Sequence, residues 1–365
     1  MTPQRVLHIV GKMDRAGAET MLMNLYRNID RTQIQFDFIT FTDREGDYDA
    51  EITQMGGKII PILANNPIQR MLKLQKFLKR RPEYTIVHAH MLLSNAFHLL
   101  AAKGAGVKHR ISHSHNTNNG YSNTAKKAYE KWALIVNRRV STHKIACGEL
   151  AANYLFGTTK DVWLLPNAVD VENMIKVANE SRNYISQKFG DNNVKIIQVG
   201  RLNEVKNHQF SLKIVEQLVK RKVDFTLYIV GQGPLEDELK QRVQQKSLTN
   251  HVKFLGIRTD ITELMASADF MIMPSLHEGF PVVLVESQAV GLRSIISNKV
   301  SSEVDLGLGL VDFLPIESTD IWVDYLLKPR SEKPTEKTVS CTLKKRGFDA
   351  VTNSQKLTQK YLSLQ

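Results

Sequence analysis

Short apolar runs alternate with segments of helical periodicity along almost the whole chain. In the first half the apolar runs occupy residues 5–10, 34–41, 58–62, 85–89, 110–112, 144–146 and 162–165. A polar stretch that extends to Asn193 interrupts the alternation, which restarts with runs at residues 194–200, 225–231, 252–256, 269–273 and 293–297. Apolar strands joined by helices form βαβ units, and such units build mostly parallel, twisted sheets. The pattern therefore predicts two α/β domains in succession.

The length of the chain supports the same division, since 365 residues exceed one typical hydrophobic core. We predict a first domain of residues 1–170, closed by the segment Pro166-Asn-Ala-Val-Asp170, and a second domain of residues 171–347. Residues 331–337 are polar and are expected to form a loop. Residues 348–365 have helical spacing, and we expect them to pack back across the join as part of the first domain.

The placement of the cysteines and the lengths of the apolar stretches indicate the compartment of the protein. Cys147 and Cys341 fall in opposite halves without the spacing of metal ligands, which suits a reducing compartment. No apolar stretch has the length of an export signal or a membrane span. We expect a cytoplasmic protein.

The formal charge of +12 comes from 49 basic and 37 acidic residues. Many of the basic residues lie in two amphipathic stretches of the first half, residues 70–81 and 126–139. Such helices can lie at the inner face of a membrane, although most basic amphipathic helices are ordinary surface helices with one face in the core. No nucleic-acid-binding motif accompanies them, so we expect no nucleic-acid partner.

The most informative stretch is residues 269–291. An apolar strand ends at Pro274, a loop follows to Pro281, and a helix from Val282 ends at Gly291. This places Glu278 on the loop at the carboxyl end of a strand and Glu286 in the second turn of the helix, at the edge where open α/β sheets bind ligands.

Free amides after Glu278, at Gly279 and Phe280, favour an anion, and a carboxylate on each side suits flanking hydroxyls. A sugar nucleotide has such a phosphate group flanked by hydroxyls. Glu286 lies in an otherwise apolar helix, where an unpaired charge is costly, so we expect it to meet a polar group.

Two cations follow the strand that ends at Gly200. Arg201 and Lys206 would stand at the same type of sheet edge, where a guanidinium fork and an ammonium can clamp a diphosphate. The pairs His88-Ala-His90 and His113-Ser-His115 each resemble half of a zinc site but lack a partner motif. We expect these histidines to be cleft residues, and we expect no metal. The first glycine loop, ending at Gly17, does not have the dinucleotide spacing.

Taken together, these motifs resemble the family-4 retaining glycosyltransferases, over nearly the whole chain. The resemblance is carried by Gly17-Ala-Glu19, Pro166-Asn-Ala-Val-Asp170, Gly200-Arg-Leu with Lys206-Asn207, Gly231-Gln-Gly-Pro234, Val252-Lys-Phe-Leu-Gly256 and the segment from Glu278 to Glu286. It implies a GT-B fold, in which two Rossmann-like α/β/α domains face each other across a cleft. Residues 8–13, 17–26 and 112–117 are most similar to those of bacterial exopolysaccharide and capsule enzymes.

The resemblance also implies roles for single residues. Arg201 and Lys206 would hold the diphosphate, Glu278 a sugar hydroxyl and Glu286 the ribose hydroxyls, with the base near Phe254 and Leu255. The segment Gly279, Phe280, Pro281 and Val282 is assigned to the sugar and phosphate, beside Gly200, with an amide donor from each residue except the proline. In the first domain, Gly17 would let its loop close on the phosphates, and His115, or else His113, would face the transferring sugar.

The implied activity is transfer of a sugar from a nucleotide diphosphate sugar, expected to be a UDP-sugar, to a saccharide acceptor expected to be lipid-linked. It would be a hexosyltransferase reaction with retained configuration and no cofactor, the nucleotide sugar being a substrate. A sugar-nucleotide epimerase of the same architecture and a non-catalytic partner subunit remain alternatives.

Overall fold

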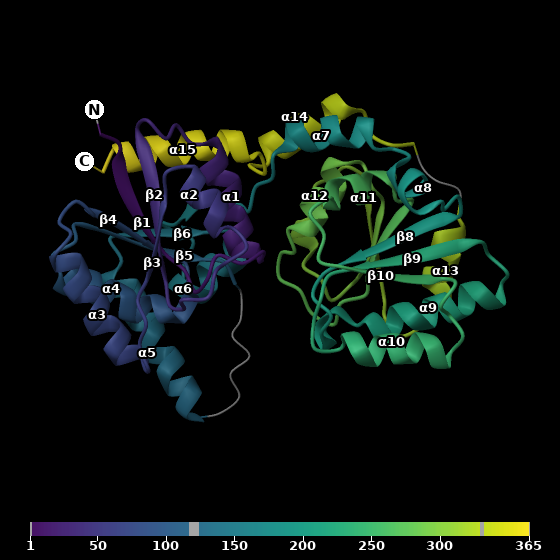
Figure 1. The fold of residues 1–365 in the computed structure, drawn as a ribbon, viewed down its shortest axis with the longest axis horizontal. Helices are drawn as coiled ribbons and strands as arrows, with labels where there is room; N and C mark the ends of the chain where they lie inside the picture. Colours follow the sequence, from purple (N-terminus) through teal and green to yellow (C-terminus); the bar gives the residue numbers. More distant parts are fainter. Residues whose placement is uncertain (1, 117–123, 329–331, 365) are drawn as a thin grey trace. The chain divides into compact units, whose positions relative to one another are not determined.

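The structure is a computed structural model that describes residues 2–116, 124–328 and 332–364. The chain forms two compact units (Figure 1). Unit 1 consists of Met1–Ala168 together with Asp349–Gln365, and unit 2 of Val169–Phe348.

Unit 1 is built on a seven-stranded parallel sheet of order β3-β2-β1-β4-β5-β6-β7. The strands are β1 (Gln4–Ile9), β2 (Ile34–Thr40), β3 (Lys58–Pro61), β4 (Ile86–Ala89), β5 (His109–Ser114), β6 (His143–Ala146) and β7 (Trp163–Leu164). Every residue of β2 is buried, which is expected of a parallel strand covered on both faces.

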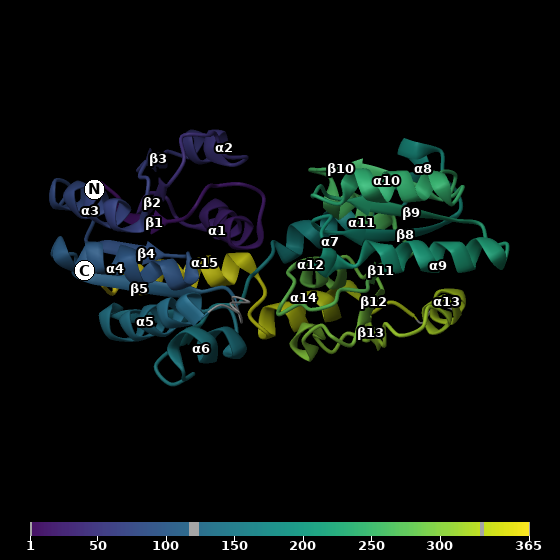
Figure 2. The same cartoon turned by 90° about the horizontal axis from the view of Figure 1, so that it is seen from below.

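Helices cover both faces of this sheet (Figure 2). One face carries α3 (Pro67–Lys79), α4 (Asn95–Gly104), which follows the short turn η1 (Leu92–Ser94), and α5 (Thr124–Val140) beside α6 (Glu149–Phe156). The other carries α1 (Gly17–Asn28) packed against α15 (Ala350–Leu362), with α2 (Asp49–Gln54) beside β3. Leu357 and Tyr361 of α15 are buried in the core on this face, so the terminal helix is part of unit 1.

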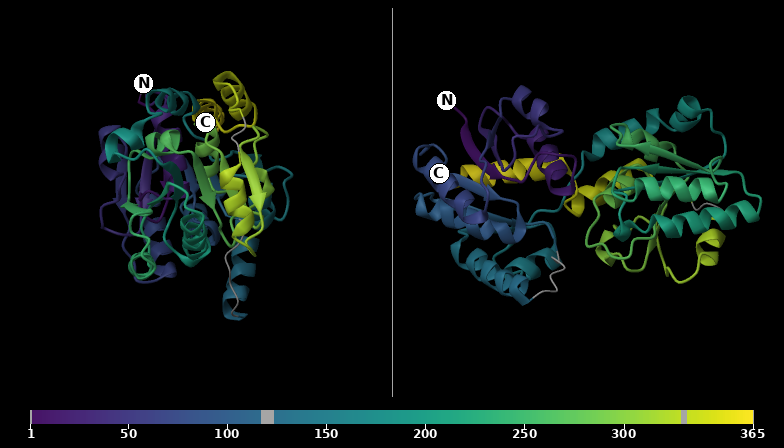
Figure 3. Two further views of the ribbon diagram at one scale, coloured as in Figure 1. Left: turned by 90° about the vertical axis from the view of Figure 1, so that its right-hand side faces the viewer. Right: turned by 60° about the horizontal axis from the view of Figure 1, so that its bottom comes forward.

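Unit 2 repeats the plan with a six-stranded parallel sheet of order β10-β9-β8-β11-β12-β13. Its strands are β8 (Val194–Val199), β9 (Phe225–Val230), β10 (Val252–Gly256), β11 (Phe270–Met273), β12 (Ser294–Ser297) and β13 (Val311–Leu314). One core packs it against α7 (Val171–Glu180), α8 (Tyr184–Phe189), α11 (Ile261–Ser267), α12 (Val283–Ala289) and α14 (Glu336–Lys345). A second core packs it against α9 (His208–Lys220), α10 (Glu236–Gln245) and α13 (Asp320–Leu327), and Figure 3 shows the sheet between the two layers. Short turns η2 (Glu204–Lys206) and η3 (Ser302–Val304) complete the unit.

Two local expectations from the sequence are wrong, and one strand was not predicted. The stretch before Asn193, expected to be a polar separator, contains α7 and α8, because Val171, Met174 and Ile185 provide a buried stripe among polar residues. Residues 336 and 337, expected in a loop, begin α14. β13 is a strand that the pattern analysis did not identify, since its central residues are only half-buried.

Strand order changes direction once in each sheet. In unit 1 this point lies between β1 and β4, and in unit 2 between β8 and β11. The loops that leave two such strands diverge to opposite faces, which opens a crevice where α/β proteins bind ligands. None of the described helices is both long and apolar enough to cross a bilayer.

Candidate functional site

An ion pair stands at the switch point of unit 2. The ammonium of Lys206, after β8, lies 2.7 Å from Oε1 of Glu278, after β11. Both side chains are mostly buried, with 17% and 18% of their surfaces exposed. A carboxylate oxygen has more than one acceptor position, so Oε1 can still accept a hydrogen bond from a ligand beside this ion pair. The structure thus brings together two of the predicted site residues.

Hydrogen bonds join the two loops that carry this pair. Asn207 donates from Nδ2 to the carbonyl of Pro274 at 3.0 Å, and the amide of Leu276 donates to the carbonyl of Val205 at 2.8 Å. Asn207 is in the left-handed conformation, φ 51°, which suits asparagine. The loops after β8 and β11 therefore form one connected framework.

Two glycines allow close packing around Lys206. At Gly200, with φ +152°, a Cβ would meet Cε of Lys206 at 3.0 Å. At Gly233 a Cβ would meet the carbonyl oxygen of Leu202 at 2.2 Å, far inside contact distance. Gly200 lets the lysine stem lie against the end of β8, and Gly233 lets the loop after β9 pack on the backbone beside it.

The remaining predicted residues of unit 2 lie on loops or strand ends. Arg201 is exposed directly after Gly200, and within the described chain its guanidinium has no ion pair or hydrogen bond. Phe254 and Leu255 are half-buried in the last part of β10, packed partly against the two cores. Residues 279–282 are half-buried, and the amides of Gly279, Phe280 and Val282 donate to no acceptor among the described residues.

Glu286 lies in the first turn of α12, not in the second as expected, because the helix begins at Val283. The residue is half-buried, and burial raises the pKa of its carboxyl to about 7. Within the part of the chain that the structure describes, the expected polar partner is absent. The carboxyl group is therefore available to a ligand.

Five histidines form a row at the switch point of unit 1. His8 is on β1, His88 on β4, His113 on β5, and His90 and His115 directly follow β4 and β5. Alternation along a strand puts the members of each H-x-H pair on one face. Rings of His90 and His113 have centroids 5.3 Å apart, and those of His113 and His115 4.0 Å apart.

Hydrogen-bond distances link part of this row. Nδ1 of His90 lies 3.0 Å from Nε2 of His115, and Nε2 of His90 lies 3.0 Å from Nδ1 of His8. Nδ1 of His88 lies 2.7 Å from the hydroxyl of Tyr361 on α15. Burial lowers the pKa of His8 to about 3 and that of His115 to about 4, although Asn167 raises the latter in part. The row consists of neutral imidazoles at pH 7.

The structure separates the two candidate histidines of the sequence. His113 is fully buried, whereas His115 is half-buried at the end of the row. Gly17 is the first residue of α1, and a Cβ there would meet nothing within 4 Å. Packing inside unit 1 does not require glycine at this position. Thr117, part of the family-like segment 112–117, lies outside the described residues.

The sequence does not predict which residues position Lys206, nor that His8 lies in the histidine row. Asn203 accepts from the amide of Lys206, and Gln198 donates from Nε2 to the carbonyl of Lys206 at 3.0 Å. His8 was not connected with the two H-x-H pairs, because the adjacency of β1 and β4 follows from sheet order and not from sequence distance. The only signal for it was a polar residue in an apolar strand.

Family patterns match both parts of the chain. The pattern described as Glycosyltransferase Family 4 matches residues 15–173, and that described as Glycosyl transferases group 1 matches residues 181–306. The chain is similar to the Bacillus subtilis protein described as putative glycosyltransferase EpsF, with 38% identity over 96% of this chain and 94% of that protein.

Two further relatives extend the comparison. An Escherichia coli UDP-Gal:α-D-GlcNAc-diphosphoundecaprenol α-1,3-galactosyltransferase is 26% identical over 84% of this chain and 83% of its own. The crystal structure of Anabaena HepE in complex with UDP superposes with a TM-score of 0.80 and 18% identity, over 98% of this chain and all of that one. The latter likeness confirms the predicted GT-B fold.

The raised pKa of Glu286 predicts a pH-dependent stability. A carboxyl whose pKa rises from 4.5 in the unfolded chain to about 7 in the folded one favours folding while protonated, and this contribution is lost as the pH rises through 7. We expect Glu286→Gln to raise the free energy of unfolding by about 2 kcal/mol at pH 8, allowing for partial exposure, and to change it little at pH 4. Urea denaturation at both pH values measures this. An equal effect at both would contradict the assignment.

Proposed function

Because the chain belongs to the glycosyltransferases of group 1 and family 4, we propose that it transfers a hexose from a UDP-sugar to a lipid-linked saccharide during exopolysaccharide or capsule synthesis. The ion pair of Lys206 and Glu278 at the switch point of unit 2 carries the proposal. It presents a cation for a diphosphate beside a carboxylate that can still accept a hydroxyl, as a nucleotide sugar requires. UDP in the complex of the Anabaena protein supports uracil as the base.

Each part of the nucleotide sugar is assigned to residues of unit 2. Lys206 and the exposed Arg201 contact the diphosphate, and the unpaired amides of Gly279, Phe280 and Val282 add donors to the same anion. Glu278 accepts from a sugar hydroxyl through Oε1. Glu286 accepts from the ribose hydroxyls, and the uracil lies near Phe254 and Leu255.

Transfer follows from where charge develops. When the sugar leaves, negative charge grows on the β-phosphate, and the ammonium of Lys206 and the guanidinium of Arg201 stabilise it. These two cations take the part that a divalent ion plays elsewhere, so we propose that transfer needs no metal ion. The acceptor hydroxyl attacks from the face that the diphosphate leaves and gives its proton to that phosphate, which retains the configuration at the anomeric carbon. We assign His115 of unit 1 to the transferring sugar.

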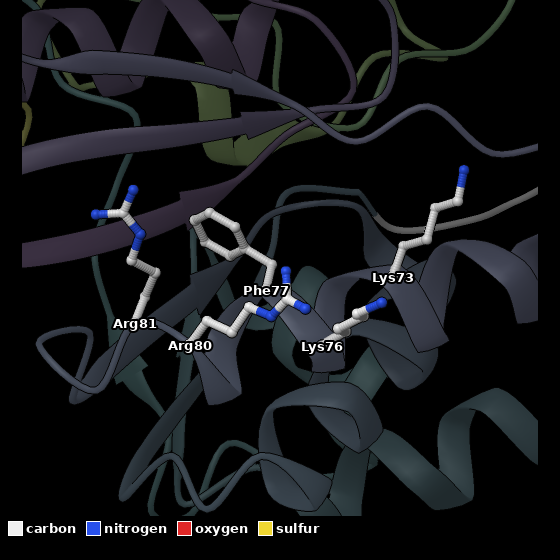
Figure 4. A pocket seen from close by; sticks show the side chains of 5 residues that line it. All are labelled: Lys73, Lys76, Phe77, Arg80 and Arg81. Carbon is white, nitrogen blue, oxygen red and sulfur yellow. The ribbon is translucent and has the colours of Figure 1, made fainter.

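The side chains on the surface of α3 support the proposal that the acceptor lies in a membrane. Ile68 and Leu72, spaced at one helical turn, have 61% and 55% of their surfaces exposed. The C-terminal part of α3 and the two residues after it line a hollow of about 440 Å³, shown in Figure 4, formed by Lys73, Lys76, Phe77, Arg80 and Arg81. Exposed apolar side chains beside four cations suit the interface of an anionic bilayer. We propose that this surface of α3 binds the inner face of the cell membrane peripherally.

Removal of a donor-site cation tests the proposed chemistry. We expect Lys206→Ala and Arg201→Ala each to lower the turnover of UDP-sugar and acceptor by about 100-fold or more, because charge on the leaving diphosphate loses its stabilisation. Glu278→Ala is expected to abolish transfer while it leaves UDP affinity within a few-fold. Steady-state kinetics and calorimetry measure the two effects.

Arg221→Ala is the matched control, since it removes an ion pair of the same 2.7 Å length, with Asp324, on the outer side of α9 and α13. Turnover by this variant should equal that of the wild type. Activity of the Lys206 or Arg201 variant within a few-fold of wild type would contradict the assignment.

The membrane proposal predicts a charge-dependent flotation with liposomes. We expect the triple variant Lys73→Gln, Lys76→Gln and Arg80→Gln to lose about 100-fold in partitioning to vesicles with anionic lipid, from about 1 kcal/mol for each charge. The control replaces Lys213, Lys220 and Lys222, three exposed lysines of unit 2, by Gln. Equal loss in both triple variants, or no flotation of the wild type, would refute contact through α3.

A further inference from the structure

Three histidines of the row in unit 1 converge on one point. His90, His113 and His115 each offer a ring nitrogen, and these three atoms lie within 4.8 Å of one another. The residues come from the ends of β4 and β5, which are adjacent in the sheet. The convergence is therefore fixed by strand pairing.

Several nitrogens in this row have no partner. His113 is 0% exposed, and neither of its ring nitrogens has a hydrogen-bond partner among the described residues. Leaving a buried polar atom unsatisfied costs about 1–3 kcal/mol. One ring with both nitrogens unsatisfied, within a row of neighbouring imidazoles, indicates that a ligand for imidazole is missing.

We propose that His90, His113 and His115 bind a transition-metal ion of the Zn²⁺ type. Neutral imidazole is a preferred ligand of such ions, and three histidines with an open fourth position form a known zinc set. Zinc–nitrogen bonds of about 2.1 Å place tetrahedral ligand atoms about 3.4 Å apart. Nδ1 of His90 and Nε2 of His115, at 3.0 Å, already have nearly this separation. The ligand nitrogen of His113 lies within 4.8 Å of the other two, so binding draws it closer to them.

His90 has a neighbour that can accept the second hydrogen bond of a metal-binding histidine. A histidine that binds a metal through one nitrogen usually donates a hydrogen bond from the other, which fixes the ring. If His90 binds through Nδ1, its Nε2 faces Nδ1 of His8 at 3.0 Å. The acceptor for that second bond is already in place.

A second group, His8, His88 and His90, has similarly spaced nitrogens and is the alternative ligand set. In that group Nδ1 of His88 already lies 2.7 Å from the hydroxyl of Tyr361. His8 and His88 are 0% and 1% exposed, which gives an ion no route from solvent. His115 is half-buried, so the group of His90, His113 and His115 reaches the surface.

Nitrogen ligands distinguish this ion from a phosphate-bridging Mg²⁺, which prefers oxygen, so the proposal is compatible with metal-free transfer. An ion on His115 would, however, withdraw that residue from the sugar. This consequence rests on the proposed function, and it predicts that micromolar Zn²⁺ lowers transfer and that EDTA restores it.

Binding of Co²⁺ to the full-length chain, stripped with EDTA, tests the site without reference to activity. We expect one equivalent to produce the visible absorption of tetrahedral Co²⁺, and Zn²⁺ to abolish it by competition. His113→Gln and His115→Gln should each weaken binding by at least about 100-fold, because even outer-shell losses cost about 10- to 100-fold. The matched control is His98→Gln, a histidine of α4 that is equally buried, also has an unpaired nitrogen and lies outside both groups.

Circular dichroism and thermal melting establish that each variant is folded, and the half-buried His115 provides a test if His113→Gln is not. Absence of the Co²⁺ spectrum in the wild type, or its persistence in both variants, would overturn the site. Loss of binding in His88→Gln with retention in His113→Gln would place the ion in the other group and also overturn it. If Co²⁺ binds as expected but Zn²⁺ leaves transfer unchanged, the metal site stands and the assignment of His115 to the sugar is wrong.

Discussion

The contact between Lys206 and Glu278 depends on sheet topology. The two residues are 72 positions apart, and they meet because β8 and β11 are neighbours at the point where strand order reverses. Hydrogen bonds from Asn207 and Leu276 connect their loops, and glycine at position 200 lets the lysine stem lie flat. A cation and an anion held this way attract each other, yet the pair leaves acceptor capacity on Glu278. When a nucleotide sugar binds, Lys206 can exchange this contact for the diphosphate, and Glu278 can exchange it for a sugar hydroxyl.

The two units use the same position for different chemistry. In unit 2 the switch point carries opposite charges, whereas in unit 1 it carries five uncharged imidazoles. An imidazole row is poorly suited to hold a diphosphate, which favours unit 2 as the donor side. Neutral nitrogens in a buried setting suit hydroxyl contacts or a borderline metal ion instead. The two units share one type of fold, so the difference between their switch points comes from the side chains at the strand ends.

Much of the fold could be predicted from the sequence because parallel strands buried on both faces are continuous apolar runs. Twelve runs were identified, and the structure has strands at all of them. β13 was missed because three of its four residues are only half-buried, so it lacks that signal. The helices α7 and α8 were missed because amphipathic segments with few apolar residues look like linkers. Glu278 and Lys206 were identified from their place after strands, but their direct contact depends on pairing that no sequence period encodes. The place of His8 beside the two H-x-H pairs was not identified for the same reason.

The most direct test of this account is a crystal structure of the chain with an intact UDP-sugar. We predict the diphosphate within hydrogen-bond distance of Lys206 and Arg201, the carboxylate of Glu278 on a sugar hydroxyl, and Glu286 on the ribose. A nucleotide bound away from the switch point of unit 2, or a divalent ion bridging its phosphates, would contradict the central claim.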